Sequence, residues 1–382
     1  MYTMNYCAPT ALYCGINSIK QNEKVILSYG KRAFVLSSRF SENCRNLALE
    51  EVEELLRRSG REYTVFADAE ENPTVESIVR VVRKIREFSP DLIIAIGGGS
   101  ALDTAKAANV LLGFPADCDA YKAFYSGVPC VNTCSSGQLP MLAVPTTAGS
   151  GSDVMGFAIL TRADTHTKLR INQISFFDAS FLDARYIQDS PRWLLDSGVA
   201  DALAHGIEAV LNTKCTPLSR VWSDYGFKLF SEFKDALLSG ELSTDDHGKM
   251  LLAASVQGMG NLQCGSTIPH GMGYALTCHK GVSHGFASII PMPAFLRQIS
   301  SRQNTVEDII HKCGFADIDE FEDYIKCIVS RNVDISVTYA ELSAWAAECA
   351  QLSPRLEAHI EPISEDDIYD IYKSSLRDSI TG

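Results

Sequence analysis

The sequence is short of basic residues: 34 lysines and arginines stand against 47 aspartates and glutamates in a chain of 382 residues. The formal net charge is −13 and the sequence pI is about 5.1. A nucleic-acid-binding protein needs a basic surface that neutralises phosphates, so this balance argues against a nucleic-acid partner. No basic run is present that would bind an anionic membrane.

Targeting and membrane-spanning segments are also missing. The N-terminal stretch MYTMNYCAPTALYCG lacks the basic start and apolar run of a signal peptide. No segment offers the ~18 apolar residues that are needed to span a bilayer. The twelve cysteines are scattered without any C-x-x-C pair, and a chain of this size buries a core without disulfides. We therefore expect reduced thiols, a cytoplasmic location and no membrane partner.

The length exceeds that of one hydrophobic core, so two domains are expected. The first part of the chain alternates apolar strand patterns with amphipathic helix patterns, which predicts an α/β domain with a Rossmann-like, doubly wound parallel sheet. The expected strands lie at 31–38, 61–69, 91–100 and within 141–154, and the expected helices at 46–60, 74–89 and 101–113. From about residue 186 the patterns are helical, at 193–212, 219–240 and 249–263. The second domain is therefore expected to be all-α.

A glycine triplet marks one candidate binding loop. Gly97, Gly98, Gly99 and Ser100 follow an apolar strand and open a helix. Glycines let the backbone approach a phosphate closely, and the helix N-terminus adds free N–H donors. The loop is not G-x-G-x-x-G, so the common dinucleotide fingerprint is absent and a tight turn without a ligand stays open. Asp103 and Lys106 share a helix face near this loop, where a solvated ion pair is the simplest interpretation.

A second loop, PTTAGSGSD at 145–153, is rich in small hydroxyl residues and glycine. Its side-chain oxygens and N–H groups can hydrogen-bond a diphosphate or a ribose. It directly follows an apolar strand, and this position favours a binding loop over a serine-rich surface turn.

A cluster of metal-binding residue types lies in the second half. Asp201 and His205 are four residues apart in a helical pattern and therefore share one face. The stretch PHGMGYALTCHKGVSHG at 269–285 adds His270, His279 and His284. One carboxylate with two or three imidazoles suits Fe²⁺ or Zn²⁺, whereas a structural zinc site more often uses cysteines. The residues predict a divalent metal site.

Four motifs in this order resemble the iron-containing (group III) alcohol dehydrogenases over nearly the whole chain. They are NPT at 72–74, GGGSALDTAK at 97–106, PTTAGSGSDV at 145–154, and the Asp201–His205 helix followed by His270 and His284. The resemblance implies a dinucleotide-binding α/β domain over 1–185, a helical metal-binding domain over 186–382, and a cleft between them. It also implies a homodimer and an NAD(P)-dependent enzyme that interconverts alcohols and aldehydes, with the metal as Lewis acid on the substrate oxygen.

The resemblance further assigns roles to individual residues. The implied metal ligands are Asp201, His205, His270 and His284. The implied contacts to the coenzyme are Ser38, Asn72, Gly97, Gly98, Gly99, Ser100, Asp103, Thr146, Thr147, Ser150 and Lys168.

The sequence departs from the family pattern at two places. Tyr274 stands where the family often has a histidine four residues after the third ligand, for which a proton relay has been proposed. His279 lies nearby and is our candidate catalytic residue, with water as the alternative proton source. Ser37-Ser38-Arg39 replaces the usual aspartate after the first strand. Hydroxyls and an arginine accept a 2′-phosphate that an aspartate repels, so we expect NADP(H) to be favoured over NAD(H).

Other functions stay open at this point. A polyol or glycerol-phosphate dehydrogenase, or a dehydroquinate-synthase-like lyase, uses the same scaffold, although the 145–154 loop and the 270–284 segment favour an alcohol dehydrogenase. A non-catalytic metal- or nucleotide-binding protein is a third alternative, but all four ligand positions are filled.

One segment of the sequence bears on the substrate. The segment HGMGYALTCHKGVSHG resembles the branch that includes phosphonoacetaldehyde reductases. An anionic substrate would need a cationic anchor, for which Arg162, Arg170 and Arg297 are candidates. Each of these fits a solvated surface charge better, so a small neutral aldehyde is the expected substrate.

Overall fold

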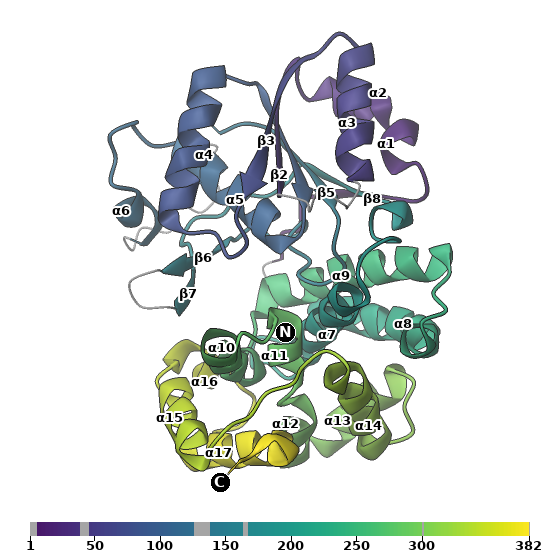
Figure 1. Cartoon of the computed structure of the whole chain (residues 1–382), viewed down its shortest axis with the longest axis vertical. Helices are drawn as coiled ribbons and strands as arrows, with labels where there is room; N and C mark the ends of the chain where they lie inside the picture. The colour runs from purple at the N-terminus through teal and green to yellow at the C-terminus, as the bar shows by residue number, and fades with distance from the viewer. Residues whose placement is uncertain (1–5, 39–45, 126–137, 163–166, 300–301, 382) are drawn as a thin grey trace. The chain divides into compact units, whose positions relative to one another are not determined.

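The computed structural model describes residues 6–38, 46–125, 138–162, 167–299 and 302–381 (Figure 1). The chain forms two compact units. We call the first the sheet unit, which comprises Cys7–Thr147 and Gly151–Asp189. The second, the helical unit, comprises Ser190–Gly382 together with the segment Ala148–Ser150.

The sheet unit is built on a six-stranded sheet in the order β1-β8-β5-β4-β2-β3, and every neighbouring pair in it is parallel. Its strands are β1 (Ala11–Cys14), β2 (Arg32–Ser38), β3 (Glu62–Ala69), β4 (Leu92–Gly97), β5 (Met141–Pro145) and β8 (Ala179–Leu182). A separate antiparallel pair joins β6 (Ile159–Arg162) to β7 (Thr167–Arg170). The parallel sheet confirms the α/β fold predicted from the alternating patterns.

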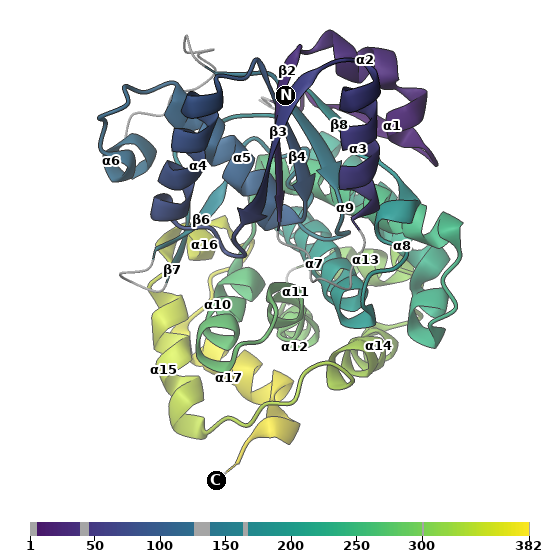
Figure 2. The same cartoon turned by 45° about the horizontal axis from the view of Figure 1, so that its top comes forward.

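Helices cover both faces of this sheet (Figures 1 and 2). Successive strand residues point to opposite faces, so Phe34 and Leu36 join one core cluster while Val35 joins the other. The helices of the first cluster are α4 (Val75–Phe88), α5 (Gly99–Leu112) and α6 (Ala120–Tyr125). Those of the second are α1 (Ser18–Gln21), α2 (Glu23–Ser28) and α3 (Leu47–Arg58). Burial on both faces explains why the central strands are continuously apolar.

Local signals place the ends of these helices. Thr74 accepts a hydrogen bond from the Ser77 N–H, and the Ser77 hydroxyl accepts one from the Thr74 N–H, which forms a capping box at the start of α4. The Asn46 side chain accepts from Leu49 N at the start of α3. Each cap satisfies N–H groups that have no partner within the helix.

The strand order fixes where a ligand would bind. The chain runs from β2 to β3 on one side and then returns to β4 on the other side of β2. Ligands of doubly wound sheets bind beyond the carboxyl ends of the strands at such a switch point. In this chain those ends carry Ser38 of β2 and Gly97 of β4.

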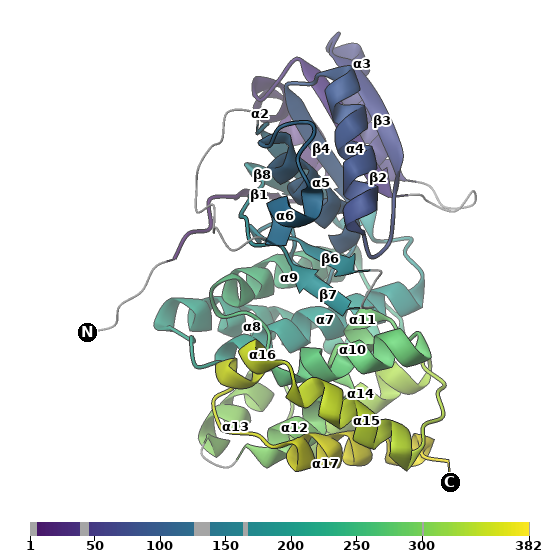
Figure 3. The same ribbon diagram turned by 90° about the vertical axis from the view of Figure 1, so that its left-hand side faces the viewer.

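The helical unit contains α7 (Arg192–Val210), α8 (Pro217–Ser239) and α9 (Thr244–Cys264), which pack on one another. Its other α-helices are α10 (Ile268–Lys280), α11 (His284–Ile289), α12 (Met292–Gln298), α13 (Gln303–Lys312), α14 (Ile318–Ser330), α15 (Tyr339–Ala350), α16 (Ser353–Ala358) and α17 (Glu365–Ser375). A short 3₁₀ turn lies at Arg377–Ser379, and another, at Ala184–Tyr186, belongs to the sheet unit. Figure 3 shows α10, α15 and α16 along one side of this unit, and α10 contacts both of the others.

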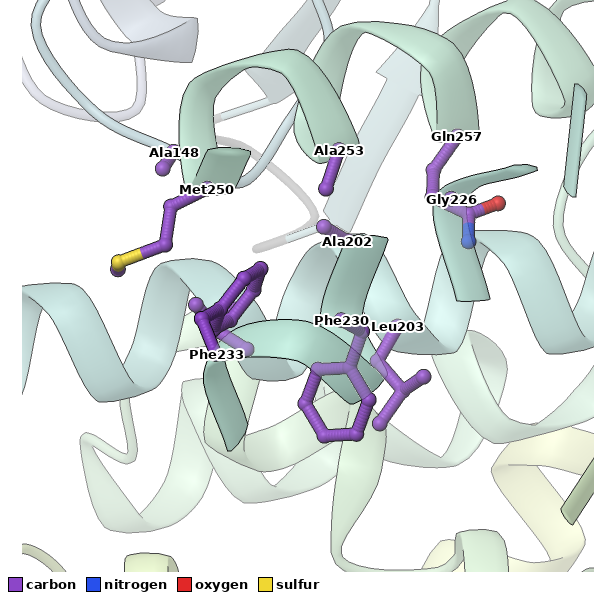
Figure 4. A pocket seen from close by; sticks show the side chains of 10 residues that line it. Ala148, Ala202, Leu203, Gly226, Phe230, Phe233, Met250, Ala253 and Gln257 are labelled. Carbon is purple, nitrogen blue, oxygen red and sulfur yellow. The ribbon is translucent and has the colours of Figure 1, made fainter. Parts of the chain in front are cut away.

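Helix α7 is the central helix of this unit, because its side chains from Val199 to Val210 are all buried. An apolar pocket lies where α7, α8 and α9 meet (Figure 4). Its lining includes Leu203, Phe230, Phe233 and Met250, with Gln257 as the one polar side chain. The pocket therefore lacks the charged groups that a nucleotide or metal requires.

The described cysteines carry free thiols, which agrees with the expectation from their spacing. Each helix in the described ranges is too short or too polar to cross a lipid bilayer.

Candidate functional site

Three helices of the helical unit bring the predicted metal ligands together. Asp201 and His205 lie on α7, His270 lies in the first turn of α10, and His284 begins α11. The helices approach closely because glycines face neighbouring backbone. A Cβ on Gly285 would overlap the Ser197 carbonyl of α7, and one on Gly273 of α10 would lie 2.9 Å from the Ala287 carbonyl.

The three imidazoles surround one carboxylate oxygen. Oδ1 of Asp201 lies 3.9 Å from Nε2 of His205, 3.5 Å from Nε2 of His270 and 3.8 Å from Nε2 of His284. The rings of His205 and His270 stack with their centroids 4.6 Å apart. These spacings exceed ordinary N–H···O hydrogen bonds.

The donor set fits a divalent metal ion. Asp201 Oδ1 and His270 Nε2 are buried and have no hydrogen-bond partner among the described residues. Ligand atoms of Asp201, His270 and His284 all lie within 4.8 Å of one another. Two ligands at ~2.1 Å from a tetrahedral ion stand about 3.4 Å apart. Buried polar atoms that face one another without a hydrogen bond are what a metal site requires.

One member of the cluster is much more exposed than the other three. The side chains of Asp201, His205 and His270 are 9%, 8% and 3% exposed, whereas that of His284 is 34% exposed. A substrate oxygen can therefore approach from the His284 side. A catalytic metal site keeps an open position of this kind, whereas a structural site is closed.

Charge sets the ionisation of the cluster before a metal binds. Burial would raise the pKa of the Asp201 carboxyl, but the three surrounding imidazoles lower it well below its usual range. Burial would lower the pKa of His270, but the carboxylates of Glu208 and Asp201 outweigh burial and raise it to about 9. Both carboxylates are therefore ionised at neutral pH, and the site attracts a cation.

Glu208 completes the site, and the sequence analysis missed it. It lies seven residues after Asp201 on the same face of α7 and is fully buried. His270 Nδ1 donates a hydrogen bond to its Oε2, while the N–H groups of Thr267 and His270 donate to its Oε1 at 3.0 and 3.2 Å. Because an ionised Glu208 can only accept, His270 Nδ1 keeps its proton, and Nε2 is the nitrogen that would lose its proton and bind a metal. The signal that could have found it is the spacing of seven from Asp201, two turns along the helix.

Tyr274 lies one turn beyond His270 on α10, at the position where the sequence departs from the family pattern. The Arg355 side chain of α16 donates to the Tyr274 hydroxyl, and its guanidinium carbon lies 4.8 Å from the Tyr274 ring centroid. Arg355 also donates to Ser266 Oγ at 2.7 Å and to the Thr267 carbonyl at 3.2 Å. Arg355 was not singled out from the sequence.

The structure does not bring His279 into the metal cluster. Nine residues after His270 correspond to two and a half helical turns, so the two side chains leave α10 on opposite faces. The His279 ring stacks on Trp345 with centroids 5.8 Å apart, and its Nε2 lies 3.5 Å from a Glu348 carboxylate oxygen. Its side chain is 47% exposed, which is the environment of a surface residue.

In the sheet unit, the glycine loop forms a cradle at the switch point. Gly98 caps α5, and Gly97 has φ of 151°, a conformation that favours glycine. A Cβ on Gly97 would lie 2.7 Å from the Ala101 Cβ and 3.1 Å from Ser38 Oγ. The first turn of the fourteen-residue helix α5 thus presents its N–H groups beside the end of β2.

Several of the predicted coenzyme contacts meet at this cradle. Thr146 N donates to the Gly97 carbonyl at 3.0 Å, and a Cβ on Gly98 would lie 2.9 Å from Thr147 Oγ1. Ser100 Oγ accepts from Asn72 N at 3.1 Å. The two loops found in the sequence are therefore neighbours in space.

Asp103 is partly buried and belongs to a hydrogen-bond network, rather than being half of a solvated ion pair. Its two oxygens accept from Ser152 Oγ at 2.6 Å and Ile159 N at 2.9 Å, and Lys106 Nζ lies 2.9 Å away. Lys106 is fully buried and also donates to three backbone carbonyls, which corrects the surface interpretation of this pair. Asp103 thus fastens the second loop to α5.

The remaining predicted contacts lie elsewhere. Lys168 lies in β7, opposite Thr161 of β6, and Ser150 ends the short segment Ala148–Ser150 of the helical unit. Arg39, on which the expected preference for NADP(H) rests, is outside the described residues.

Replacing Gly97 with alanine is expected to weaken coenzyme binding about tenfold, or ~1.4 kcal/mol. The new Cβ meets Ala101 at 2.7 Å in a backbone conformation that alanine rarely adopts, so the cradle must shift. Binding of NADPH, followed by the change in its fluorescence, measures the effect. Gly60→Asn is the matched control, because Gly60 has φ of 66° and open space around it. If the Kd for NADPH were unchanged in Gly97→Ala, the loop around Gly97 would not be part of the coenzyme site.

Comparisons with known proteins agree with this geometry. A family model described as iron-containing alcohol dehydrogenase matches residues 9–184, and one for the C-terminal part of the same family matches 195–376. The chain is 26% identical over 336 residues to a sulfoacetaldehyde reductase of Bilophila wadsworthia, covering 86% of this chain and 82% of that protein. It is 25% identical to an NADPH-dependent butanol dehydrogenase of Clostridium saccharobutylicum, covering 80% and 81%.

A solved structure of an iron-containing alcohol dehydrogenase from Thermotoga maritima superimposes with a TM-score of 0.85 at 27% identity, covering 98% of this chain and 100% of that one. The fold and the two family models define an oxidoreductase that acts on alcohols and aldehydes. The chain belongs to the iron-containing alcohol dehydrogenase family, which confirms the resemblance of the four motifs.

Proposed function

We propose that this chain is a metal-dependent reductase of small aldehydes that takes hydride from NADPH. The observation that carries the proposal is the arrangement of three imidazole Nε2 atoms at 3.5–3.9 Å around the buried Oδ1 of Asp201. We assign Asp201, His205, His270 and His284 as the ligands of one divalent metal, Fe²⁺ or Zn²⁺. We also assign residues 1–185 to a coenzyme-binding domain and 186–382 to a metal-binding domain.

When bound, the metal polarises the carbonyl of the aldehyde and the nicotinamide supplies the hydride. The residues of the chain prepare this step. Asp201 contributes negative charge that retains the cation. Glu208 holds the His270 ring with Nε2 facing Asp201, so the ring does not have to reorient when a metal replaces the Nε2 proton. The more exposed side of His284 leaves room for the substrate. The N-terminus of α5 and the cradle at Gly97 and Gly98 bind the coenzyme diphosphate.

The preference for NADPH rests on the residues that follow β2. Ser37 and Ser38 occupy the end of this strand, where an aspartate would repel a 2′-phosphate. The relative from Clostridium saccharobutylicum is described as NADPH-dependent, which supports the assignment. A kcat/KM for NADH equal to or above that for NADPH would contradict it.

The proposal predicts complete metal dependence. Protein stripped with a chelator is expected to lose NADPH oxidation with butyraldehyde, and anaerobic addition of Fe²⁺ or Zn²⁺ is expected to restore it. The rate of absorbance loss at the NADPH band measures this. Full activity after verified metal removal would contradict the proposal. Absence of turnover with every metal and both coenzymes would favour a lyase or a polyol dehydrogenase on this scaffold.

A further inference from the structure

One arginine beside the metal cluster has no carboxylate in direct contact, although its charge interacts at longer range with the buried carboxylate of Glu208. In the described part of the chain, no Asp or Glu oxygen forms an ion pair with Arg355, whose hydrogen bonds go to Ser266 Oγ, the Thr267 carbonyl and the Tyr274 hydroxyl. All three acceptors are neutral. Glu208 already accepts hydrogen bonds from His270 and Thr267, so Arg355 has no carboxylate of its own, and a bound anion would lower the cost of its partial burial.

The arginines that the sequence suggested as anchors differ from Arg355. Arg297 donates to the carboxylates of both Asp319 and Glu322, so its charge is already neutralised. Arg170 lies over the Phe157 ring in the sheet unit. The side chain of Arg162 is outside the described residues.

Arg355 is tied to the residues that position the metal cluster. Its acceptor Tyr274 follows the ligand His270 by four residues, so their Cβ atoms stand about 5–6 Å apart on one helix face. Arg355 also donates to Ser266 Oγ and to the Thr267 carbonyl, and the N–H of the same Thr267 donates to Glu208. These contacts place the positive charge of Arg355 beside the residues that hold His270 in position.

The local sequence holds Arg355 in place. Gly271, next to the ligand His270, leaves room for its stem, since a Cβ there would lie 3.2 Å from Arg355 Cδ. The end of α16 is joined to the segment after α7 by the hydrogen bond from Thr213 N to the Ala358 carbonyl at 2.9 Å. A fixed guanidinium loses little side-chain entropy when it binds an anion.

We propose that Arg355, with the hydroxyl of Tyr274, binds the anionic end of a short aldehyde that carries a sulfonate or phosphonate group. This inference rests on the proposed function, because it assumes that the carbonyl end is reduced at the metal cluster. The planar guanidinium offers parallel N–H donors that match two oxygens of a tetrahedral oxyanion. The spacing of one helical turn between Tyr274 and His270 suits a two-carbon aldehyde. The relative described as a sulfoacetaldehyde reductase supports this substrate class.

The test compares charged and neutral aldehydes of similar size. Wild-type protein, Arg355→Met and Arg355→Lys are assayed with sulfoacetaldehyde, phosphonoacetaldehyde and butyraldehyde. We expect the wild type to favour one of the anionic aldehydes at least tenfold in kcat/KM, and the better of the two identifies the head group. Arg355→Met is expected to lose about 100-fold in kcat/KM with that substrate, mainly through KM, and at least tenfold less with butyraldehyde, so that the preference for the anionic aldehyde disappears. Arg355→Lys is expected to fall between them, because lysine keeps the charge without the planar donors.

Arg297→Met is the matched control, since it removes a paired arginine of the same helical unit. Equal losses of Arg355→Met on charged and neutral aldehydes would overturn the proposal and show that Arg355 only supports the fold. A wild type without preference for either anionic aldehyde would also overturn it, while its metal-dependent reduction of butyraldehyde would leave the proposed function standing. If Arg355→Met does not fold, the proposal is tested instead by measuring whether ethanesulfonate and ethylphosphonate inhibit the reduction of butyraldehyde by the wild type. Competition with the aldehyde supports the proposal, and no inhibition by either anion contradicts it.

Discussion

Replacing Asp201 with alanine is expected to give a protein that binds no stoichiometric metal and reduces aldehydes at least about 10³-fold more slowly. Asp201 is the one anionic member of the assigned ligand set, and its Oδ1 is the point around which the three Nε2 atoms gather. Loss of the cation removes several kcal/mol of charge stabilisation, and ~4 kcal/mol corresponds to a factor of about 10³ in rate. Metal content per chain and kcat with butyraldehyde measure the two effects.

Two further variants make this result specific. Asp201→Asn keeps the shape of the side chain but removes its charge, and we expect it to lose metal nearly as completely. His311→Ala removes an exposed histidine of α13 and is expected to keep both metal and activity. Normal metal content and kcat in Asp201→Ala would show that the four residues are not the metal site.

Replacing Glu208 with glutamine is expected to weaken metal binding about 10- to 100-fold and to leave kcat near wild type at saturating metal. The carboxylate of Glu208 accepts from His270 Nδ1 and from two backbone N–H groups. The amide nitrogen of glutamine is a donor, so it opposes the Nδ1 proton of His270 and favours the tautomer with the proton on Nε2. Competition with a chromophoric chelator measures the metal Kd.

Glu208→Ala should affect stability as well. It leaves the buried Nδ1 of His270 and the N–H of Thr267 without their acceptor, which costs ~3 kcal/mol or more in the free energy of unfolding. Glu357→Gln, an exposed substitution on α16, is the matched control. A metal Kd that is unchanged in Glu208→Gln would mean that Glu208 supports the helix packing but not the metal ligand.

The regular part of the fold could be predicted from the sequence because its signals are local. The apolar spacing of 74–89 predicted a helix, and α4 runs over Val75–Phe88 behind its capping box at Thr74. The expected strand at 31–38 corresponds to β2 at Arg32–Ser38. The sequence analysis missed β1 and β8, since each has only four residues and too little length for a pattern.

Only those residues of the site that lie in recognisable motifs could be predicted from the sequence. The four proposed ligands lie in recognisable spacings, and the structure brings them together. In the sequence alone, Glu208 looks like any other glutamate of a helix, because its burial is not visible there. Its spacing of seven residues from Asp201 was the only signal that the sequence offered. Arg355 lies 81 residues from its acceptor Tyr274, so only the folded chain reveals the pair. His279 was close in sequence to two ligands, but the helical period turns it to the opposite face of α10.

The measurement that tests the account most directly is an activity titration of metal-free protein with Fe²⁺ or Zn²⁺ under anaerobic conditions. NADPH-linked reduction of butyraldehyde is followed as metal is added, in wild type and in Asp201→Ala. The account predicts that wild-type activity rises from near zero in a straight line and levels off at about one metal per chain, and that Asp201→Ala stays inactive throughout. Activity without metal, or equal restoration in Asp201→Ala, would contradict it.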